Sequence, residues 1–120
     1  MKVIKASEIK MEKSNTNFCT GEIMRQILLS ANESKDYLMG IHTFPKGVRN
    51  KFHTHIGEQI LIITAGEGIV ATEDEQWNVS AGDIIIVPAG LKHWHGANTK
   101  SDLSHIAIVR GGDKLTQLED

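Results

Sequence analysis

The chain of 120 residues has only one cysteine, Cys19. A single cysteine excludes both an intramolecular disulfide and a zinc cluster built from thiolates of one chain. Any metal ion must therefore bind to nitrogen or oxygen ligands. Cys19 follows Phe18 at the expected start of a strand. Because free cysteine is among the most buried residue types, we expect it to be a core residue rather than a nucleophile.

The chain also lacks an excess of positive charge and any long apolar run. Its formal net charge is −2, and its Lys and Arg residues are scattered, so no field exists that would attract nucleic acid or an anionic membrane. No stretch is suited to span a bilayer, and the polar N-terminal segment does not resemble a signal peptide. We therefore expect a cytoplasmic protein with a small-molecule partner, and neither a nucleic-acid nor a membrane partner.

A sustained helical period is missing as well. The apolar residues come in short runs separated by Gly, Asn, Asp and Pro, a pattern typical of an all-β protein. Segments such as Ala65–Gly68 suit tight turns, so we expect consecutive strands to pair antiparallel. Many short, evenly spaced strands indicate a sandwich or barrel, and the interior of a jelly-roll barrel is a natural ligand pocket.

These runs predict a single domain with nine strands in its central part. We expect an N-terminal arm or short strand at residues 1–17, a β-barrel at 18–110, and a C-terminal tail at 111–120 that forms a helical turn or frays. The expected strands are Ile23–Leu29, Tyr37–Phe44, Lys51–His55, Gln59–Thr64, Gly68–Glu73, Gln76–Val79, Ile84–Val87, Trp94–Asn98 and Leu103–Val109.

Histidine, in contrast, is plentiful and arranged in pairs. Six histidines occur at positions 42, 53, 55, 93, 95 and 105, and four of them form two His-x-His pairs. Residues i and i+2 of a strand point to the same face, so His53 and His55 project together, as do His93 and His95. Neutral imidazole is the commonest protein ligand for divalent transition metals. One such pair alone is more often a pair of solvated surface histidines than a pair of ligands, so the metal interpretation depends on the surrounding sequence.

The segments around the pairs resemble the two sequence motifs of the cupin family. Segment 47–66 resembles the first motif and segment 82–93 the second, in the right order and separated by a short hairpin. The resemblance implies an all-β double-stranded β-helix, the jelly-roll barrel of cupins. The matching residues are Gly47, His53, His55 and Gly66 in the first motif, and Gly82, Pro88, Gly90 and His93 in the second.

The resemblance also implies a metal site. In cupins the ligands are both histidines of the first motif, the residue four positions after the second of them, and the histidine of the second motif. These positions correspond to His53, His55, Gln59 and His93 in this chain. The family usually has Glu where this chain has Gln59, and Glu58 stands one residue earlier. Because a one-residue shift moves a side chain to the opposite strand face, we expect Gln59 as ligand and Glu58 in solvent or behind the ligands.

A closer resemblance covers most of the chain. Segments 53–66, 88–97 and 104–108 are similar to a cupin subgroup that includes carboxymuconolactone-decarboxylase-like proteins and manganese-dependent hydroxynitrile lyases. This resemblance implies one divalent metal ion, with manganese favoured over iron, nickel or zinc, which such ligands also accept. It further implies proton transfer by His105 near the metal. A homodimer is expected too, because pairing of two copies covers the edge strands of a small barrel.

The roles of the remaining histidines and of Trp94 rest on fewer signals. His95 shares a strand face with His93, so we expect it to be an acid–base group beside the metal. His105 is equally consistent with a hydrogen-bonded core histidine. His42 has no motif support and is expected to be structural. Alternation points Trp94 away from the metal face, toward the exterior or a partner subunit.

The ligand set indicates the chemistry. Three imidazoles and one carboxamide are neutral, so a divalent cation keeps its full charge and acts as a strong Lewis acid that stabilises an oxyanion or a departing anion. This favours a metal-dependent lyase, hydroxynitrile-lyase-like or decarboxylase-like, acting on a small oxygen-bearing substrate. Two alternatives stay open: a cupin that binds or senses a small molecule without turnover, and a metal-dependent dioxygenase.

Overall fold

The computed structural model describes residues 1–120 and confirms the all-β prediction. It contains one short 3-10 helix, η1 at Ala6–Glu8, and no helix that is long and apolar enough to cross a membrane. All of the strand pairs are antiparallel. The strands are β1 (Glu12–Ser14), β2 (Ile23–Leu29), β3 (Tyr37–Phe44), β4 (His53–His55), β5 (Gln59–Ala71), β6 (Gln76–Ser80), β7 (Ile84–Val87), β8 (Trp94–Ala97), β9 (Leu103–Arg110) and β10 (Leu115–Gln117).

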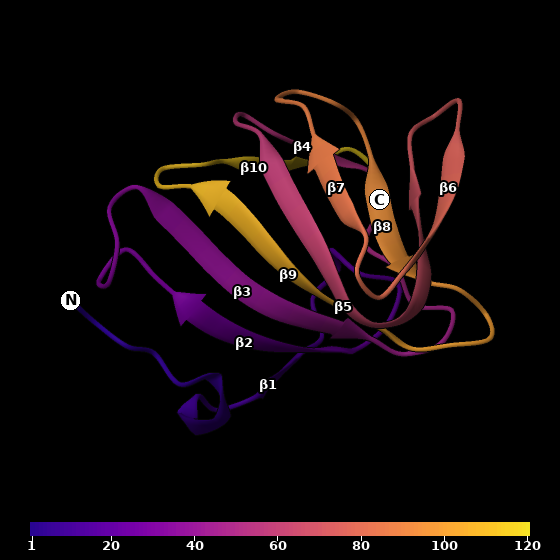
Figure 1. Cartoon of the computed structure of the whole chain (residues 1–120). Coiled ribbons are helices and arrows are strands. Elements are labelled where there is room, and N and C mark those ends of the chain that lie inside the picture. The colour runs from indigo at the N-terminus through magenta and orange to yellow at the C-terminus, as the bar shows by residue number, and fades with distance from the viewer.

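Eight strands form one sheet that curls into a barrel around the long strand β5 (Figure 1). The sheet runs in the order β1-β2-β3-β9-β5, and the first half of β5 also pairs with β7. The second half of β5 pairs with β6 and β8. The two halves meet near Gly66, which has a positive φ of 77° and where a Cβ would overlap the carbonyl oxygen of Asp102. Only glycine fits both demands.

The remaining strands, β4 and β10, pair with each other and close the barrel. Isolated bridges join His53 to His93 and Arg49 to Gly96, so the segment containing β4 lies beside the one containing β8. At Gly96 an added Cβ would overlap Arg49, which shows how closely these segments approach. This approach brings both His-x-His pairs to one wall of the barrel.

Strand pairing differs from the expectation that consecutive strands form hairpins. Only β1–β2, β2–β3 and β5–β6 are consecutive pairs, and each of the others joins strands with at least one further strand between them in the chain. The reason is the jelly-roll path, which crosses from one side of the barrel to the other at most connections. The predicted turn at Ala65–Gly68 is also wrong. That segment continues β5: after a bulge, Ala65 and Gly66 pair with β9, and Glu67 and Gly68 pair with β6.

The C-terminal tail is a further correction, since residues 115–117 form β10 and neither coil into a helical turn nor fray. Beyond β10, the backbone N–H of Leu118 donates to the Phe52 carbonyl at 2.8 Å. The Glu119 carboxylate accepts from both terminal nitrogens of Arg49, at 3.1 and 2.8 Å. Phe52 and Arg49 lie far from the C-terminal tail in the sequence, so no local sequence pattern could predict these contacts. At the other end of the chain, β1 is the short strand that was one of the two expectations there.

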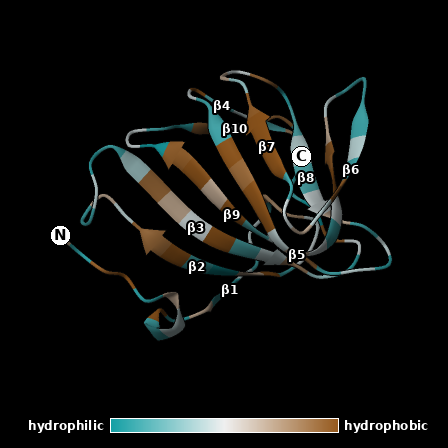
Figure 2. Cartoon of the chain, viewed as in Figure 1, coloured by the Kyte–Doolittle hydropathy of each residue, from teal (hydrophilic) through white to brown (hydrophobic).

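The hydrophobic core fills one end of the barrel. Leu61 and Leu103 are fully buried, and Phe44 is 1% exposed. Cys19 belongs to one hydrophobic cluster with Phe44 and Leu103, and its burial raises the pKa of its thiol to about 11, which keeps the thiol protonated at neutral pH. This supports a core role for Cys19. Figure 2 shows hydrophobic residues along β5, β7 and β9, of which β5 and β9 contribute Ile63 and Leu103 to this core.

Candidate metal centre

Three of the predicted ligands converge on one point of the barrel wall. His53 and His55 point inward from β4, and His93 lies just before β8. The backbone N–H of His53 donates to the carbonyl of His93 at 3.0 Å and the reverse bond is 3.1 Å, which holds the two segments together. One ring nitrogen of each histidine lies within 4.8 Å of the others, and all three side chains are buried. The fold therefore brings a ring nitrogen of each of the three histidines to one place.

Hydrogen bonds orient the three rings in the same way. In each ring Nδ1 donates to an oxygen atom: to the Lys51 carbonyl in His53 at 2.7 Å, to the Asp113 carboxylate in His55 at 2.6 Å, and to the Leu91 carbonyl in His93 at 2.8 Å. A proton on Nδ1 leaves the lone pair of Nε2 free, which is the form of neutral imidazole that binds a metal. The triad thus offers three Nε2 atoms to one centre.

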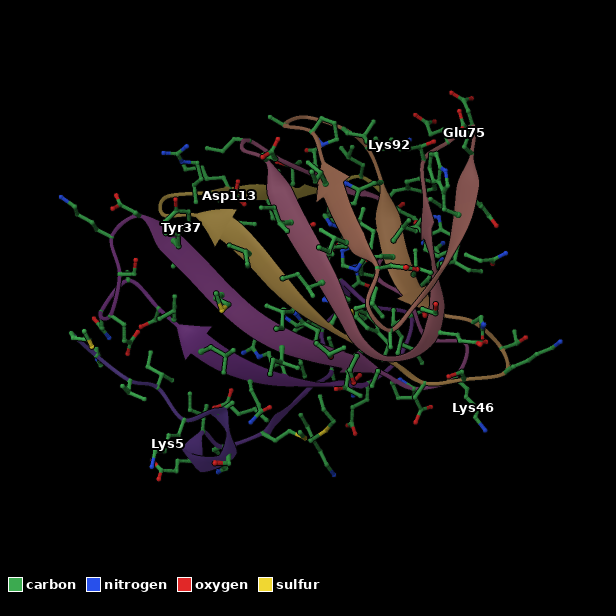
Figure 3. The ribbon with its side chains drawn as sticks, viewed as in Figure 1. Lys5, Tyr37, Lys46, Glu75, Lys92 and Asp113 are labelled. Carbon is green, nitrogen blue, oxygen red and sulfur yellow. The ribbon has the colours of Figure 1, made fainter.

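Asp113 is a residue of this site that the sequence did not predict. It lies in the turn after β9 (Figure 3), and its second carboxylate oxygen accepts from the backbone N–H of Gly57 at 3.1 Å. A carboxylate behind a histidine fixes the ring and raises the basicity of the other ring nitrogen. Asp113 stands 58 positions from His55 in the chain, so only the closure of the barrel brings them together.

Gln59, at the start of β5, faces the same centre. Its Oε1 lies 3.3 Å from Nε2 of His93. With the His93 proton on Nδ1, both atoms are acceptors, and a cation bound by both removes their repulsion. Nε2 of His55 is buried and has no partner, an arrangement that costs about 1–3 kcal/mol unless a ligand satisfies it. Both observations fit a divalent metal ion. Glu58 is exposed, which agrees with strand parity.

His95 and His105 form a hydrogen-bonded pair beside the triad. The ring of His95, on β8, lies 5.7 Å between centroids from both His53 and His93. Nε2 of His105, on β9, is 3.0 Å from Nδ1 of His95. Asn50, which the sequence did not point to, anchors His95: its Oδ1 accepts from the His95 backbone at 2.9 Å, and its Nδ2 lies 3.2 Å from Nε2. The structure therefore places both expected acid–base residues at the site.

Burial keeps these rings neutral. It lowers the pKa of His53 and of His105 to about 3, and it lowers the pKa of His93 and, well below the usual value, that of His95. The neighbouring histidines lower these pKa values further, because two positive rings would repel each other. At neutral pH these four rings are therefore uncharged, and uncharged imidazole is the form that binds a metal ion.

His42, expected to be structural, lies in the wall of the same cavity. It stands directly opposite His105 in the β3–β9 pair, with 5.5 Å between ring centroids, and its Nδ1 is buried without a partner. Burial and then the charge of Arg25 lower the pKa of His42 to about 4. No motif covers this position, so only the cross-strand register could reveal that His42 belongs to the site.

These side chains line a cavity of about 480 Å³. Trp94 is not among the lining residues, as alternation predicts, and the Arg49 guanidinium lies 4.6 Å above its ring instead. No Asp or Glu lines the cavity. Much of the wall beside the histidines is apolar and comes from β2, β3, β9 and β10: Ile27, Leu29, Leu38, Ala107, Val109 and Leu115.

Comparisons with known proteins agree with this architecture. The chain is 33% identical over 97 residues to an (R)-mandelonitrile lyase of Granulicella tundricola, covering 80% of this chain and 74% of that protein. It is 31% identical over 111 residues to an oxalate-binding protein of Thermotoga maritima, covering 89% and 92%. The crystal structure of a cupin-like protein of Thermotoga maritima superposes with a TM-score of 0.84 at 28% identity, covering 90% and 84%. A family model described as a cupin domain matches residues 40–109, more than half of the chain, and so this chain belongs to the cupin family.

Proposed function

We propose that this protein binds one divalent metal ion through His53, His55, His93 and Gln59 and acts as a lyase on a small oxygen-bearing substrate. The observation that carries the proposal is the convergence of three buried imidazoles, each with Nδ1 hydrogen-bonded to an oxygen atom, beside a second, hydrogen-bonded histidine pair. The similarity to a mandelonitrile lyase supports lyase chemistry. Manganese is the metal we propose first, on the resemblance to manganese-dependent lyases.

The ion supplies Lewis acidity when bound, which acidifies a nearby hydroxyl and stabilises negative charge on oxygen. The side chains around it do not weaken that effect, because none of the four proposed ligands carries a negative charge. Gln59 in place of a glutamate is the residue that makes the set neutral. This is why the site suits cleavage next to an oxygen atom.

The pair formed by His95 and His105 moves the proton. A neutral His105 accepts the proton of the substrate hydroxyl, and the 3.0 Å bond between its Nε2 and Nδ1 of His95 lets the two rings share it. For a cyanohydrin, the electron pair of the O–H bond forms the carbonyl double bond of the aldehyde. The electron pair of the carbon–carbon bond leaves with cyanide. His95 returns the proton to cyanide, so that aldehyde and hydrogen cyanide depart and the pair is neutral again.

Binding without turnover is the second candidate, because one relative of similar length is an oxalate-binding protein. Both functions use the same cavity and the same proposed metal ligands. Product formation separates them. A dioxygenase would in addition consume oxygen, which an oxygen electrode detects.

The first experiment is elemental analysis of protein purified without a histidine tag. We expect about one divalent ion per chain in the wild type and none after the double change His53→Ala and His55→Ala, with the β-sheet circular dichroism signal retained. No metal in the wild type under metal-supplemented conditions would contradict the proposal. Loss of the β-sheet signal in the variant would show that the ion is structural.

The second experiment measures turnover of mandelonitrile, with hydroxy acids and lactones as further substrates. His105→Ala should lower turnover about a hundredfold or more, the range for a positioned acid or base, at unchanged metal content. Lys46→Ala is the matched control, because Lys46 lies at the opposite end of the barrel from Asp113 (Figure 3). Equal activity of the His105 variant and the wild type would remove His105 from the mechanism. Absence of product with every substrate would favour the binding function.

We also propose that the protein is a cytoplasmic homodimer. Two observations support dimerisation: Ile84 and Ile86 of β7 are 66% and 62% exposed, and Trp77 on the nearby β6 is 48% exposed. Apolar side chains gathered at a barrel edge favour association with a second copy.

A further inference from the structure

Arg25 is the one fully charged side chain among the residues that line the cavity. Its guanidinium makes no hydrogen bond within the protein. Its one ion pair, from Nε to the Glu12 carboxylate, is 3.9 Å long, and the side chain is 44% exposed. An ion pair of that length and exposure contributes about 0–1 kcal/mol, so the guanidinium is available to a ligand.

The strand register puts Arg25 in line with two of the histidines. Arg25 on β2 stands opposite His42 on β3, and His42 stands opposite His105 on β9. All three line the cavity, and the three strands lie side by side in Figure 1. Neighbouring strands are about 4.8 Å apart, so the backbone of Arg25 is about 10 Å from that of His105. The row thus connects the partly exposed guanidinium of Arg25 to His105, one of the two residues of the proton-transfer pair.

The next row across the same strands is apolar. It contains Ile27, Gly40 and Ala107, which are again direct cross-strand neighbours. At Gly40 an added Cβ would lie 3.1 Å from the Gln26 carbonyl oxygen and 3.5 Å from the His42 ring, so the ring packs over this glycine. All three residues of the row line the cavity and give it an apolar wall beside Arg25, His42 and His105.

The charge of Arg25 acts inside the cavity. It is the second cause, after burial, of the lowered pKa of His42. No carboxylate lines the cavity, and the Glu12 carboxylate that pairs with Arg25 lies outside the lining, 3.9 Å away and 52% exposed. An anionic ligand is therefore attracted from the Arg25 side, and it is attracted from the other side by any cation held at the histidine triad.

We propose that the substrate is an organic acid whose carboxylate is bound by Arg25 while its oxygen-bearing carbon lies beside His105. The part of this statement that concerns the reacting carbon rests on the proposed function. The carboxylate part rests only on the row of Arg25, His42 and His105 and on the absence of acidic side chains. A hydroxy or oxo acid with a short apolar group offers a carboxylate to Arg25, an oxygen-bearing carbon to His105 and an apolar surface to the cavity wall. Arginine suits this task because its planar guanidinium binds a carboxylate through two parallel hydrogen bonds.

Isothermal titration with mandelate and with mandelamide tests the carboxylate site. The two probes share a ring and a hydroxyl and differ in charge. We expect wild-type protein to bind mandelate, and Arg25→Met to weaken that binding about tenfold or more, as the loss of a charged hydrogen bond predicts. Mandelamide binding should stay within about twofold in the same variant, because its amide has no charge to lose. Arg25→Lys should restore part of the affinity for mandelate.

The matched control is Arg110→Met, which removes the same charge from the exposed end of β9 outside the cavity. Its mandelate affinity should equal that of the wild type. Equal losses in the two variants, or no loss with Arg25→Met, would overturn the carboxylate site, and so would wild-type protein that fails to bind mandelate. Circular dichroism of each variant shows that it is folded.

Running the titration with and without added metal separates this inference from the proposed function. Mandelate binding by metal-free protein that depends on Arg25 supports the carboxylate site even if the chain takes up no metal. Metal uptake together with mandelate binding that is independent of Arg25 overturns the carboxylate site and leaves the metal centre standing.

Discussion

Metal-free protein should lose stability steeply on mild acidification, because its histidines are buried as neutral rings. Burial lowers the pKa of His42 to about 4 and that of His105 to about 3, against 6.5 in an unfolded chain. Below pH 6.5 the unfolded chain therefore binds protons that the folded chain does not. The free energy of unfolding then falls as the pH falls, until the folded rings take up protons as well.

The size of the effect follows from the pKa differences. Between pH 6.5 and the pKa of the folded histidine, each such histidine lowers the free energy of unfolding by about 1.4 kcal/mol for every pH unit of acidification. Between pH 7 and pH 5, each of the two histidines should cost about 2 kcal/mol, so the pair should cost about 4 kcal/mol. That is a large share of the about 5–15 kcal/mol by which a domain is usually stable. The loss from His42 should level off near pH 4 and that from His105 near pH 3.

Urea unfolding of chelator-treated protein at the two pH values measures this loss. The informative variant is His42→Leu, because His42 is not among the proposed metal ligands. Between pH 7 and pH 5 it should lose about 2 kcal/mol less stability than the wild type. Comparing the two pH values cancels any effect of the new side chain on packing. Lys46→Leu, a control at an exposed site, should lose as much as the wild type. Equal losses in wild type and His42→Leu would refute the reasoning that His42 is buried and neutral.

Three further predictions concern the ligand support, the core and the assembly. Asp113→Asn should weaken metal binding about tenfold to a hundredfold in a competition titration, because His55 loses the carboxylate behind its ring; unchanged affinity would argue against that support. Leu61→Ala should lower the free energy of unfolding by about 2–5 kcal/mol in urea, since Leu61 is fully buried; a loss under about 1 kcal/mol would mean that the core closes around the gap. Sedimentation should find a dimer at micromolar concentration and a monomer for Ile86→Glu, whereas a wild-type monomer would contradict the proposed dimer.

The fold class could be predicted from local strand patterns, and the location of the triad from the resemblance to the two cupin motifs. Strand alternation alone places His53 and His55 on one face and separates Gln59 from Glu58. The resemblance to the cupin motifs added His93, because in a cupin barrel the segment of the second motif lies beside that of the first. For these residues, a short segment and a known family were enough.

Only the tertiary structure decided what surrounds the triad. Asp113 reaches His55 because the C-terminal segment returns along β4 as a strand, and no turn signal or apolar period within residues 111–120 required that. The row of Arg25, His42 and His105 arises from the register of the neighbouring strands β2 and β3 with β9, which comes from a distant part of the chain. Register and closure are set by contacts summed over the whole barrel, so the charge and the proton acceptors of the cavity could be recognised only once all its walls were in place.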